Sequence, residues 1–130
     1  MPHILIADDD PAVRSLLRRV LSKEGYCVET ASDGRIAMEM VATALPDLLI
    51  TDLLMPGLTG WSVFARVRRH AAQLPILVIS GAETGIPLGT PSLQNHAVFL
   101  RKPIMIGQLL AAVEHFLDAS LTTPDTVCGN

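Results

Sequence analysis

Three consecutive aspartates, Asp8, Asp9 and Asp10, follow an apolar run near the N-terminus. Adjacent carboxylates repel one another, so they require either a nearby cation or separate roles. Another aspartate, Asp52, follows the apolar run LLIT at residues 48–51. Carboxylate oxygens are preferred ligands of hard divalent cations such as Mg²⁺. The acidic residues therefore predict a metal site, provided that the fold brings the ends of these two runs together.

Two further apolar runs end in a hydroxyl or an ammonium group. The run ILVIS ends in Ser80, and the run VFLR is followed by Lys102. In open α/β sheets, sites form at the carboxyl ends of the parallel strands. We therefore expect Ser80 and Lys102 to lie at the same edge as the aspartates, although they are distant in the sequence.

The apolar runs that precede these residues have the pattern of buried strands. Unbroken apolar runs are typical of strands covered on both faces, as in a parallel sheet. The run CVETA is more mixed and is expected at an edge of the sheet. Together the runs predict five strands, at residues 3–7, 27–31, 48–51, 76–80 and 98–101.

Helical patterns alternate with the predicted strands. Asp10 precedes Pro11, which suits the first position of a helix, so we expect Asp10 to cap the first one. The alternation predicts an α/β fold with three layers, α/β/α, in which helices cover both faces of a parallel sheet. The apolar stripes run from Val13 to Leu21, from Ala37 to Leu45, from Val63 to Val67 and from Ile106 to Leu117.

The segment at residues 81–97 does not fit the alternation. It contains Gly85, Pro87, Gly89 and Pro91. Inside a helix, proline costs about 3 kcal/mol and glycine about 1 kcal/mol relative to alanine. We therefore expect the fourth helix to be shortened or replaced by a glycine- and proline-rich loop.

A chain of 130 residues suits one domain, which we expect at residues 1–119. Residues 120–130 have no apolar periodicity and are expected to form a tail or a truncated linker. The net charge of −3 does not suggest nucleic-acid binding, which requires a strongly basic face. The apolar runs are too short to span a membrane, and the N-terminus lacks the basic region of a secretory signal. The two cysteines have no metal-ligand spacing, so we expect a reduced, cytoplasmic protein.

The chemistry-bearing segments resemble the receiver domain of bacterial two-component response regulators. The resemblance rests on ADDD at 7–10, DLLITDLLMPGLTG at 47–60, ILVISG at 76–81 and FLRKP at 99–103, in this order. It covers about residues 3–118. It implies a flavodoxin-like sheet of five parallel strands in the order 2-1-3-4-5.

The resemblance implies a role for each residue at the predicted site. Asp52 matches the phosphoacceptor, which takes a phosphoryl group from a sensor histidine kinase or a histidine phosphotransfer protein. Asp8 and Asp9 match the acidic pair that binds Mg²⁺ (or Mn²⁺) together with Asp52 and the backbone carbonyl of Leu54. Lys102 matches the lysine that pairs with a phosphoryl oxygen.

Other residues match the parts of the family that transmit and end the signal. Ser80 stands where a hydroxyl binds the phosphoryl group, and Phe99 where an aromatic ring swings inward. The face formed by residues 81–119 would then change and control a downstream effector or fused output domain. Leu54 and Ala82 occupy the positions that flank the hydrolytic water, and neither side chain can orient it. The resemblance therefore implies that the domain is not an enzyme. It would catalyse only its own phosphorylation and slow autodephosphorylation.

Two alternative functions rank below this interpretation. A receiver-like interaction module that is never phosphorylated is disfavoured because all of the site residues are present. A phosphatase of the haloacid dehalogenase type is suggested by Asp8 and Asp10 after an apolar run. That family requires threonine or valine two residues past the second aspartate, where this chain has Ala12.

Under the receiver interpretation, we expect no direct nucleic-acid binding by this domain and no membrane association.

Overall fold

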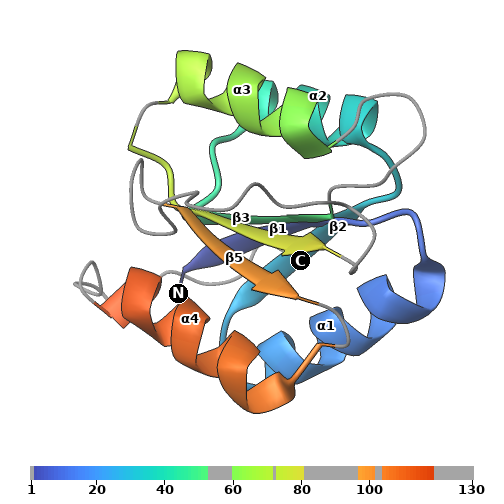
Figure 1. Ribbon diagram of the computed structural model, residues 1–130, viewed down its shortest axis with the longest axis vertical. Coiled ribbons are helices and arrows are strands. Elements are labelled where there is room, and N and C mark those ends of the chain that lie inside the picture. Colours follow the sequence, from blue (N-terminus) through green and yellow to red (C-terminus); the bar gives the residue numbers. More distant parts are fainter. Residues whose placement is uncertain (1, 53–59, 72, 81–96, 102–103, 119–130) are drawn as a thin grey trace.

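A five-stranded parallel sheet forms the centre of the computed structural model, which describes residues 2–52, 60–71, 73–80, 97–101 and 104–118. Helices cover both faces of the sheet (Figure 1). The elements run in the order β1 (His3–Ala7), α1 (Pro11–Lys23), β2 (Cys27–Ala31), α2 (Gly34–Thr43), β3 (Leu48–Asp52), α3 (Gly60–His70), β4 (Ile76–Ser80), β5 (Ala97–Arg101) and α4 (Ile106–Asp118).

The strands lie side by side in the order β2-β1-β3-β4-β5, and every neighbouring pair is parallel. This order confirms the flavodoxin-like α/β fold. It also places β2 at an edge, as its mixed sequence predicts. Strand β3 extends by one residue to Asp52 and β5 begins one residue earlier, at Ala97. All five carboxyl ends therefore point to the same edge.

The sheet separates two aliphatic cores. Successive residues of a strand point to opposite faces. Leu5 belongs to the core beneath α2 and α3, whereas Ile4 belongs to the core beneath α1 and α4. Figure 1 shows the two helical layers on opposite sides of the sheet. Burying one such side chain contributes about 1.5–3 kcal/mol, so these strands are held in place mainly by apolar packing.

Helix α1 begins and ends with specific local geometry. The side chain of Asp10 accepts a hydrogen bond of 2.9 Å from the backbone N–H of Ala12, and Pro11 is the first helical residue. The predicted cap is therefore confirmed. At the other end, Gly25 has φ 95°, and the N–H of Tyr26 donates to the carbonyl of Leu21 at 3.3 Å. This left-handed ending suits glycine because glycine has no Cβ.

Helix α2 is shorter than its apolar stripe. Asp33 caps it by accepting a hydrogen bond of 2.8 Å from the N–H of Ile36. The stripe predicts a helix that reaches Leu45, but the helix ends at Thr43. Ala44 already has extended backbone angles, φ −150° and ψ 113°. Pro46 also favours an extended backbone in the residue before it, which ends the helix ahead of its last apolar position.

An arginine closes the connection between α3 and β4. The Nη1 atom of Arg68 donates to the carbonyl oxygens of Leu74 at 2.6 Å and Ala71 at 3.3 Å. Partial burial lowers the pKa of Arg68 because desolvation disfavours the charged form. The pattern of α3 indicates an arginine-rich solvated face, so sequence reasoning does not identify this role.

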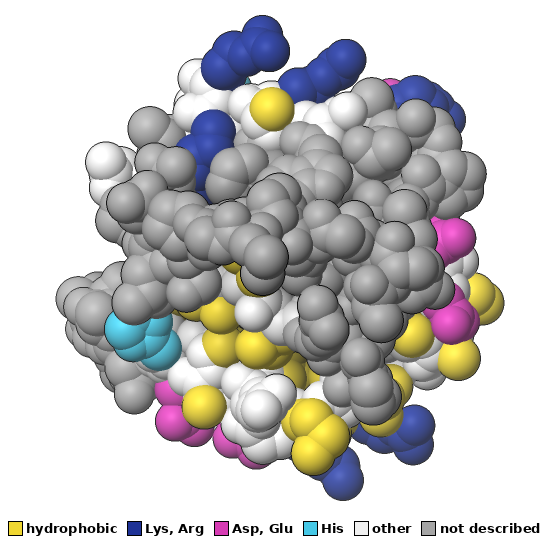
Figure 2. Space-filling view, in the orientation of Figure 1, with side chains coloured by type: hydrophobic (Ala, Val, Ile, Leu, Met, Phe, Trp, Pro, Cys, Tyr) yellow, Lys and Arg dark blue, Asp and Glu magenta, His cyan; other side chains and the backbone are white. Residues whose placement is uncertain are grey.

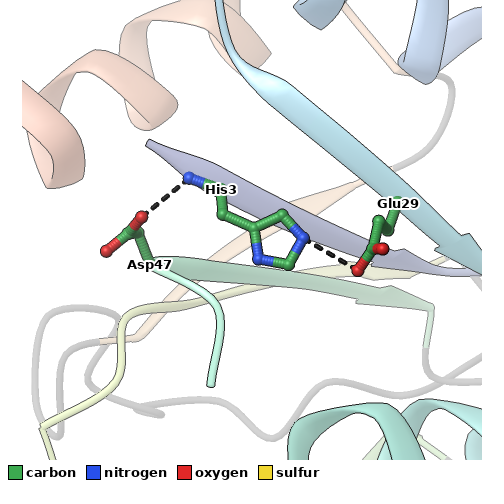
Figure 3. Close-up of polar contacts among 3 residues, drawn as sticks. All are labelled: His3, Glu29 and Asp47. Carbon is green, nitrogen blue, oxygen red and sulfur yellow. Dashed lines mark hydrogen bonds and ion pairs between the residues drawn. The ribbon is translucent and has the colours of Figure 1, made fainter. Parts of the chain in front are cut away.

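The amino ends of the strands are joined by polar contacts of His3 (Figure 3). Its Nε2 atom lies 2.9 Å from a carboxylate oxygen of Glu29 on β2. Its backbone N–H donates to the side chain of Asp47 at 2.7 Å, and its carbonyl accepts from the N–H of Asp47 at 2.7 Å. These contacts tie β1 to both neighbouring strands at the edge opposite Asp52.

Charged side chains occur on more than one side of the domain. Figure 2 shows lysine and arginine side chains over the layer of α2 and α3 and others near α1. No helix among the described residues is both long enough and apolar enough to cross a membrane. Cys27 is buried at the beginning of β2, and the other cysteine, Cys128, lies outside the described residues.

Two expectations concern segments outside the described residues. The question of a shortened fourth helix falls on residues 81–96, which the structure does not describe. The proposed tail or linker at 120–130 also lies outside them. Both expectations therefore stay predictions.

Candidate functional site

Three aspartates meet at the carboxyl edge of the sheet. Asp8 and Asp9 follow β1, and Asp52 ends the neighbouring strand β3. One carboxylate oxygen from each residue lies within 4.8 Å of the other two. Asp8 is only 2% exposed and Asp52 only 4%, whereas Asp9 is exposed. The fold thus brings together carboxylates from two separate segments, as the acidic residues predict.

Asp8 is held by three hydrogen bonds, two through its backbone and one through its side chain. Its N–H donates to the carbonyl of Ala31 on β2 at 3.1 Å. Its Oδ1 atom accepts from the backbone N–H of Asp10 at 2.8 Å. Its carbonyl oxygen accepts from Nη1 of Arg14 at 2.7 Å. These hydrogen bonds give the loop between β1 and α1 a defined geometry.

The carboxylate cluster suits a hard divalent cation. An octahedral Mg²⁺ has oxygen ligands at about 2.0–2.1 Å, so two of its ligands are separated by at most about 4 Å. The carboxylate oxygens of Asp8, Asp9 and Asp52 lie within 4.8 Å of one another, so small side-chain movements would bring them to that geometry. Two carboxylates buried side by side repel each other, and the positive charge of a bound cation would offset that repulsion. The residues present fit such an ion.

The other predicted site residues are placed only in part. Asp52 pairs with Ile79 in the β3–β4 ladder, and the next residue of β4 is Ser80. The backbone of Ser80 is therefore at the same edge as the acidic cluster. Phe99 is in β5, is partly buried, and packs against the core beneath α2 and α3. Residues outside the described part include Lys102, Leu54 and Ala82.

Two contacts at this site were missed by sequence reasoning. The side chain of Arg14 reaches the carbonyl of Asp8, and the buried hydroxyl of Thr51 donates to the carbonyl of Asp52 at 3.1 Å. The position of Arg14 in the first turn after the acidic run was an available signal. The sequence does not say whether that side chain turns toward the loop or toward solvent.

A hollow of about 550 Å³ lies at the opposite edge of the sheet. It is lined by residues that follow α2 and α3, including Leu45 and Leu74, and by Phe116 of α4. No predicted site residue lines it. The chemistry of the aspartates is therefore separate from this hollow.

Comparisons with known proteins identify similar sequences. A sequence model of the response regulator receiver domain matches residues 4–114. The chain is 39% identical over 133 residues to response regulator MprA of Mycolicibacterium vanbaalenii, covering 98% of this chain and 54% of that protein. It is 41% identical over 129 residues to MprA of Mycobacterium leprae, covering 95% and 53%. The chain thus spans about half the length of these relatives.

Solved structures show the same architecture. A putative response regulator from Chloroflexus aurantiacus has a TM-score of 0.78 and 33% identity, covering 90% of this chain and 98% of that one. A response regulator receiver domain protein from Clostridium thermocellum has a TM-score of 0.82 and covers 92% and 97%. At 21% identity, the second comparison supports the fold alone.

Proposed function

The chain belongs to the response regulator receiver domain family, and on that premise we propose that Asp52 accepts a phosphoryl group with the help of Mg²⁺. The observation that carries this proposal is the cluster of Asp8, Asp9 and Asp52 at the carboxyl edge of the sheet. Asp52 is almost fully buried at the end of a central strand. A nucleophile in that position is fixed by the sheet and shielded from most of the solvent.

Each residue has a specific task in the proposed reaction. A carboxylate oxygen of Asp52 attacks the phosphorus of a phosphohistidine on the partner protein. The new P–O bond forms as the P–N bond breaks, and the imidazole leaves with the electron pair of that bond. Asp8 and Asp9 would hold the cation, and the backbone carbonyl of Leu54 would be a further ligand. Lys102 pairs with one of the phosphoryl oxygens.

The cation has one function in this scheme. When bound, Mg²⁺ offsets the repulsion between the carboxylates and the phosphoryl oxygens in the transition state. Asp8 can hold it because its main chain is bonded to Ala31 and Arg14, which leaves its carboxylate near the other two. Mn²⁺ has similar oxygen preferences and is expected to substitute.

We infer that the phosphoryl group changes the face formed by residues 81–119. Phosphorylation adds about −1.5 to −2 charges and three strong acceptor oxygens at one position. Ser80 follows the Asp52–Ile79 pair in the ladder, which supports a role for its hydroxyl in binding the new oxygens. Phe99 lies on β5, the strand next to the one that carries Ser80, and its ring would move together with Ser80. A local change in charge thus biases a two-state element.

The proposed partners follow from the family. The donor is a sensor histidine kinase or a histidine phosphotransfer protein in the cytoplasm. The recipient of the signal is a downstream effector or a fused output domain. The matched MprA proteins are about twice as long as the aligned region. We therefore propose, from the family alone, that the signal passes to such an effector or output domain.

A mass measurement tests the phosphoacceptor proposal. The protein is incubated with Mg²⁺ and a small acyl phosphate, and its intact mass is then determined. We expect a gain of one phosphoryl group that is absent in Asp52→Asn and in excess chelator. Asp47→Asn is the matched control, because Asp47 lies just before the other end of β3. Turnover of a phosphoester would instead favour an enzyme, and no reaction with any donor would favour an unphosphorylated interaction module.

A further inference from the structure

Arg14 connects helix α1 to the acidic loop. Its Nη1 atom donates a hydrogen bond of 2.7 Å to the backbone carbonyl of Asp8, and its own N–H donates to the carbonyl of Asp10 at 3.0 Å. The side chain is partly buried. One residue in the first turn of α1 is thus bonded to both ends of the segment from Asp8 to Asp10.

The bonded carbonyl belongs to the peptide that joins the two candidate metal ligands Asp8 and Asp9. A peptide group is planar, so fixing its carbonyl also fixes the direction of the following N–Cα bond. The side chain of Asp9 is exposed, and packing therefore constrains it little. Arg14 binds the carbonyl of the peptide between Asp8 and Asp9. The orientation of the Asp9 side chain therefore depends strongly on this peptide.

We propose that Arg14 is a positioning residue for the metal site, an inference that rests on the proposed function. Arg14 bonds to a neutral carbonyl and not to a carboxylate oxygen of Asp8 or Asp9, so it does not compete with a cation for those oxygens. Partners that orient metal ligands typically change affinity by about 10–100-fold when they are removed. The role of Arg14 is to keep the ligands in place without touching the metal or the phosphoryl group.

The positive charge of Arg14 repels a bound cation, so its effect on Mg²⁺ affinity is opposite to that of positioning the ligands. If charge dominated, removing Arg14 would strengthen Mg²⁺ binding, whereas loss of positioning weakens it. Arg18 lies one turn further along α1, is exposed, and makes no side-chain hydrogen bond or ion pair with other described residues. Arg18→Ala therefore removes a comparable charge from the same helix without removing a contact.

The test is a calorimetric titration of the full chain with Mg²⁺. We expect Arg14→Ala to weaken Mg²⁺ binding by about tenfold. Arg14→Lys, which keeps the charge and one donor, should recover most of the affinity. Arg18→Ala should stay within about twofold of the unaltered protein, because exposed charges interact weakly in water. Relative to the unaltered protein, Arg14→Ala should lower the thermal unfolding midpoint more in saturating Mg²⁺ than in chelator.

Several outcomes would overturn this role of Arg14. Unchanged or tighter Mg²⁺ binding by Arg14→Ala would exclude positioning. A loss of stability that is the same in Mg²⁺ and in chelator would show a purely structural residue. If the unaltered protein bound no Mg²⁺, both this inference and the metal site would be wrong. Arg14-dependent Mg²⁺ binding without phosphorylation of Asp52 would support the inference while contradicting the phosphoacceptor proposal.

Discussion

The backbone N–H of Asp10 donates a hydrogen bond of 2.8 Å to Oδ1 of Asp8. The donor is a main-chain group, so any residue except proline at position 10 can make this bond. The side chain of Asp10 has another partner, the N–H of Ala12, and caps α1. The three adjacent aspartates therefore contribute differently: two carboxylates join Asp52, and the third stabilises the helix that follows.

Two substitutions test this difference. We predict that Asp9→Ala abolishes Mg²⁺-dependent phosphorylation, because it removes one carboxylate from the cluster. Asp10→Ser should leave phosphorylation largely intact, because serine also caps helices and the backbone N–H remains. The rate of phosphoryl uptake from an acyl phosphate checks both. Equal losses in the two variants would contradict the separate roles.

Mg²⁺ is expected to stabilise the fold. A ligand that binds only the folded state at 100 times its dissociation constant contributes about 2.7 kcal/mol. We predict that the thermal unfolding midpoint rises with Mg²⁺ concentration and that Asp9→Ala loses this response. Asp10→Ser serves as the control that retains it. A monovalent salt at matched ionic strength separates binding from screening, and an equal rise in that salt would contradict a specific site.

The phosphorylated form is expected to be long-lived. Neither Leu54 nor Ala82 has a polar side chain that could orient a water molecule toward the phosphoryl group. We predict slow autodephosphorylation, measured as the loss of phosphorylated mass after the donor is removed. Leu54→Asn should speed the loss severalfold, because an amide can hold the water. Loss within seconds from the unaltered protein, without a phosphatase, would rule this out.

Arg68 is expected to contribute to stability. Arg68→Ala removes hydrogen bonds to the carbonyl groups of Leu74 and Ala71, and bonds from charged donors are worth about 1.5–3 kcal/mol. Because the side chain is only partly buried, we predict a loss of about 1–2 kcal/mol in the free energy of unfolding, measured in urea. The exposed neighbour Arg69 provides the control, and Arg69→Ala should change stability by less than about 0.5 kcal/mol. Similar losses in both variants would indicate a general charge effect.

Local patterns predicted most of the elements. Apolar runs and stripes place the strands within one residue, because burial on both faces leaves a continuous apolar pattern. The cap Asp10 depends only on residues within one turn, so it also follows from the sequence. The end of α2 at Thr43 was not predicted, because its apolar stripe continues past the point where the backbone becomes extended.

The sequence by itself determined the type of each described element and the chemical groups at the ends of the described strands, since these depend on residues close together in the chain. Tertiary structure decided which ends meet, and it buried Asp8 and Asp52 while leaving Asp9 exposed. It also turned Arg14 toward the carbonyl of Asp8 and Arg68 toward that of Leu74. An arginine can point to solvent or to a neighbouring loop with the same local sequence. Only the packing of β1 against β3 and of the helices against the sheet selects one of these directions.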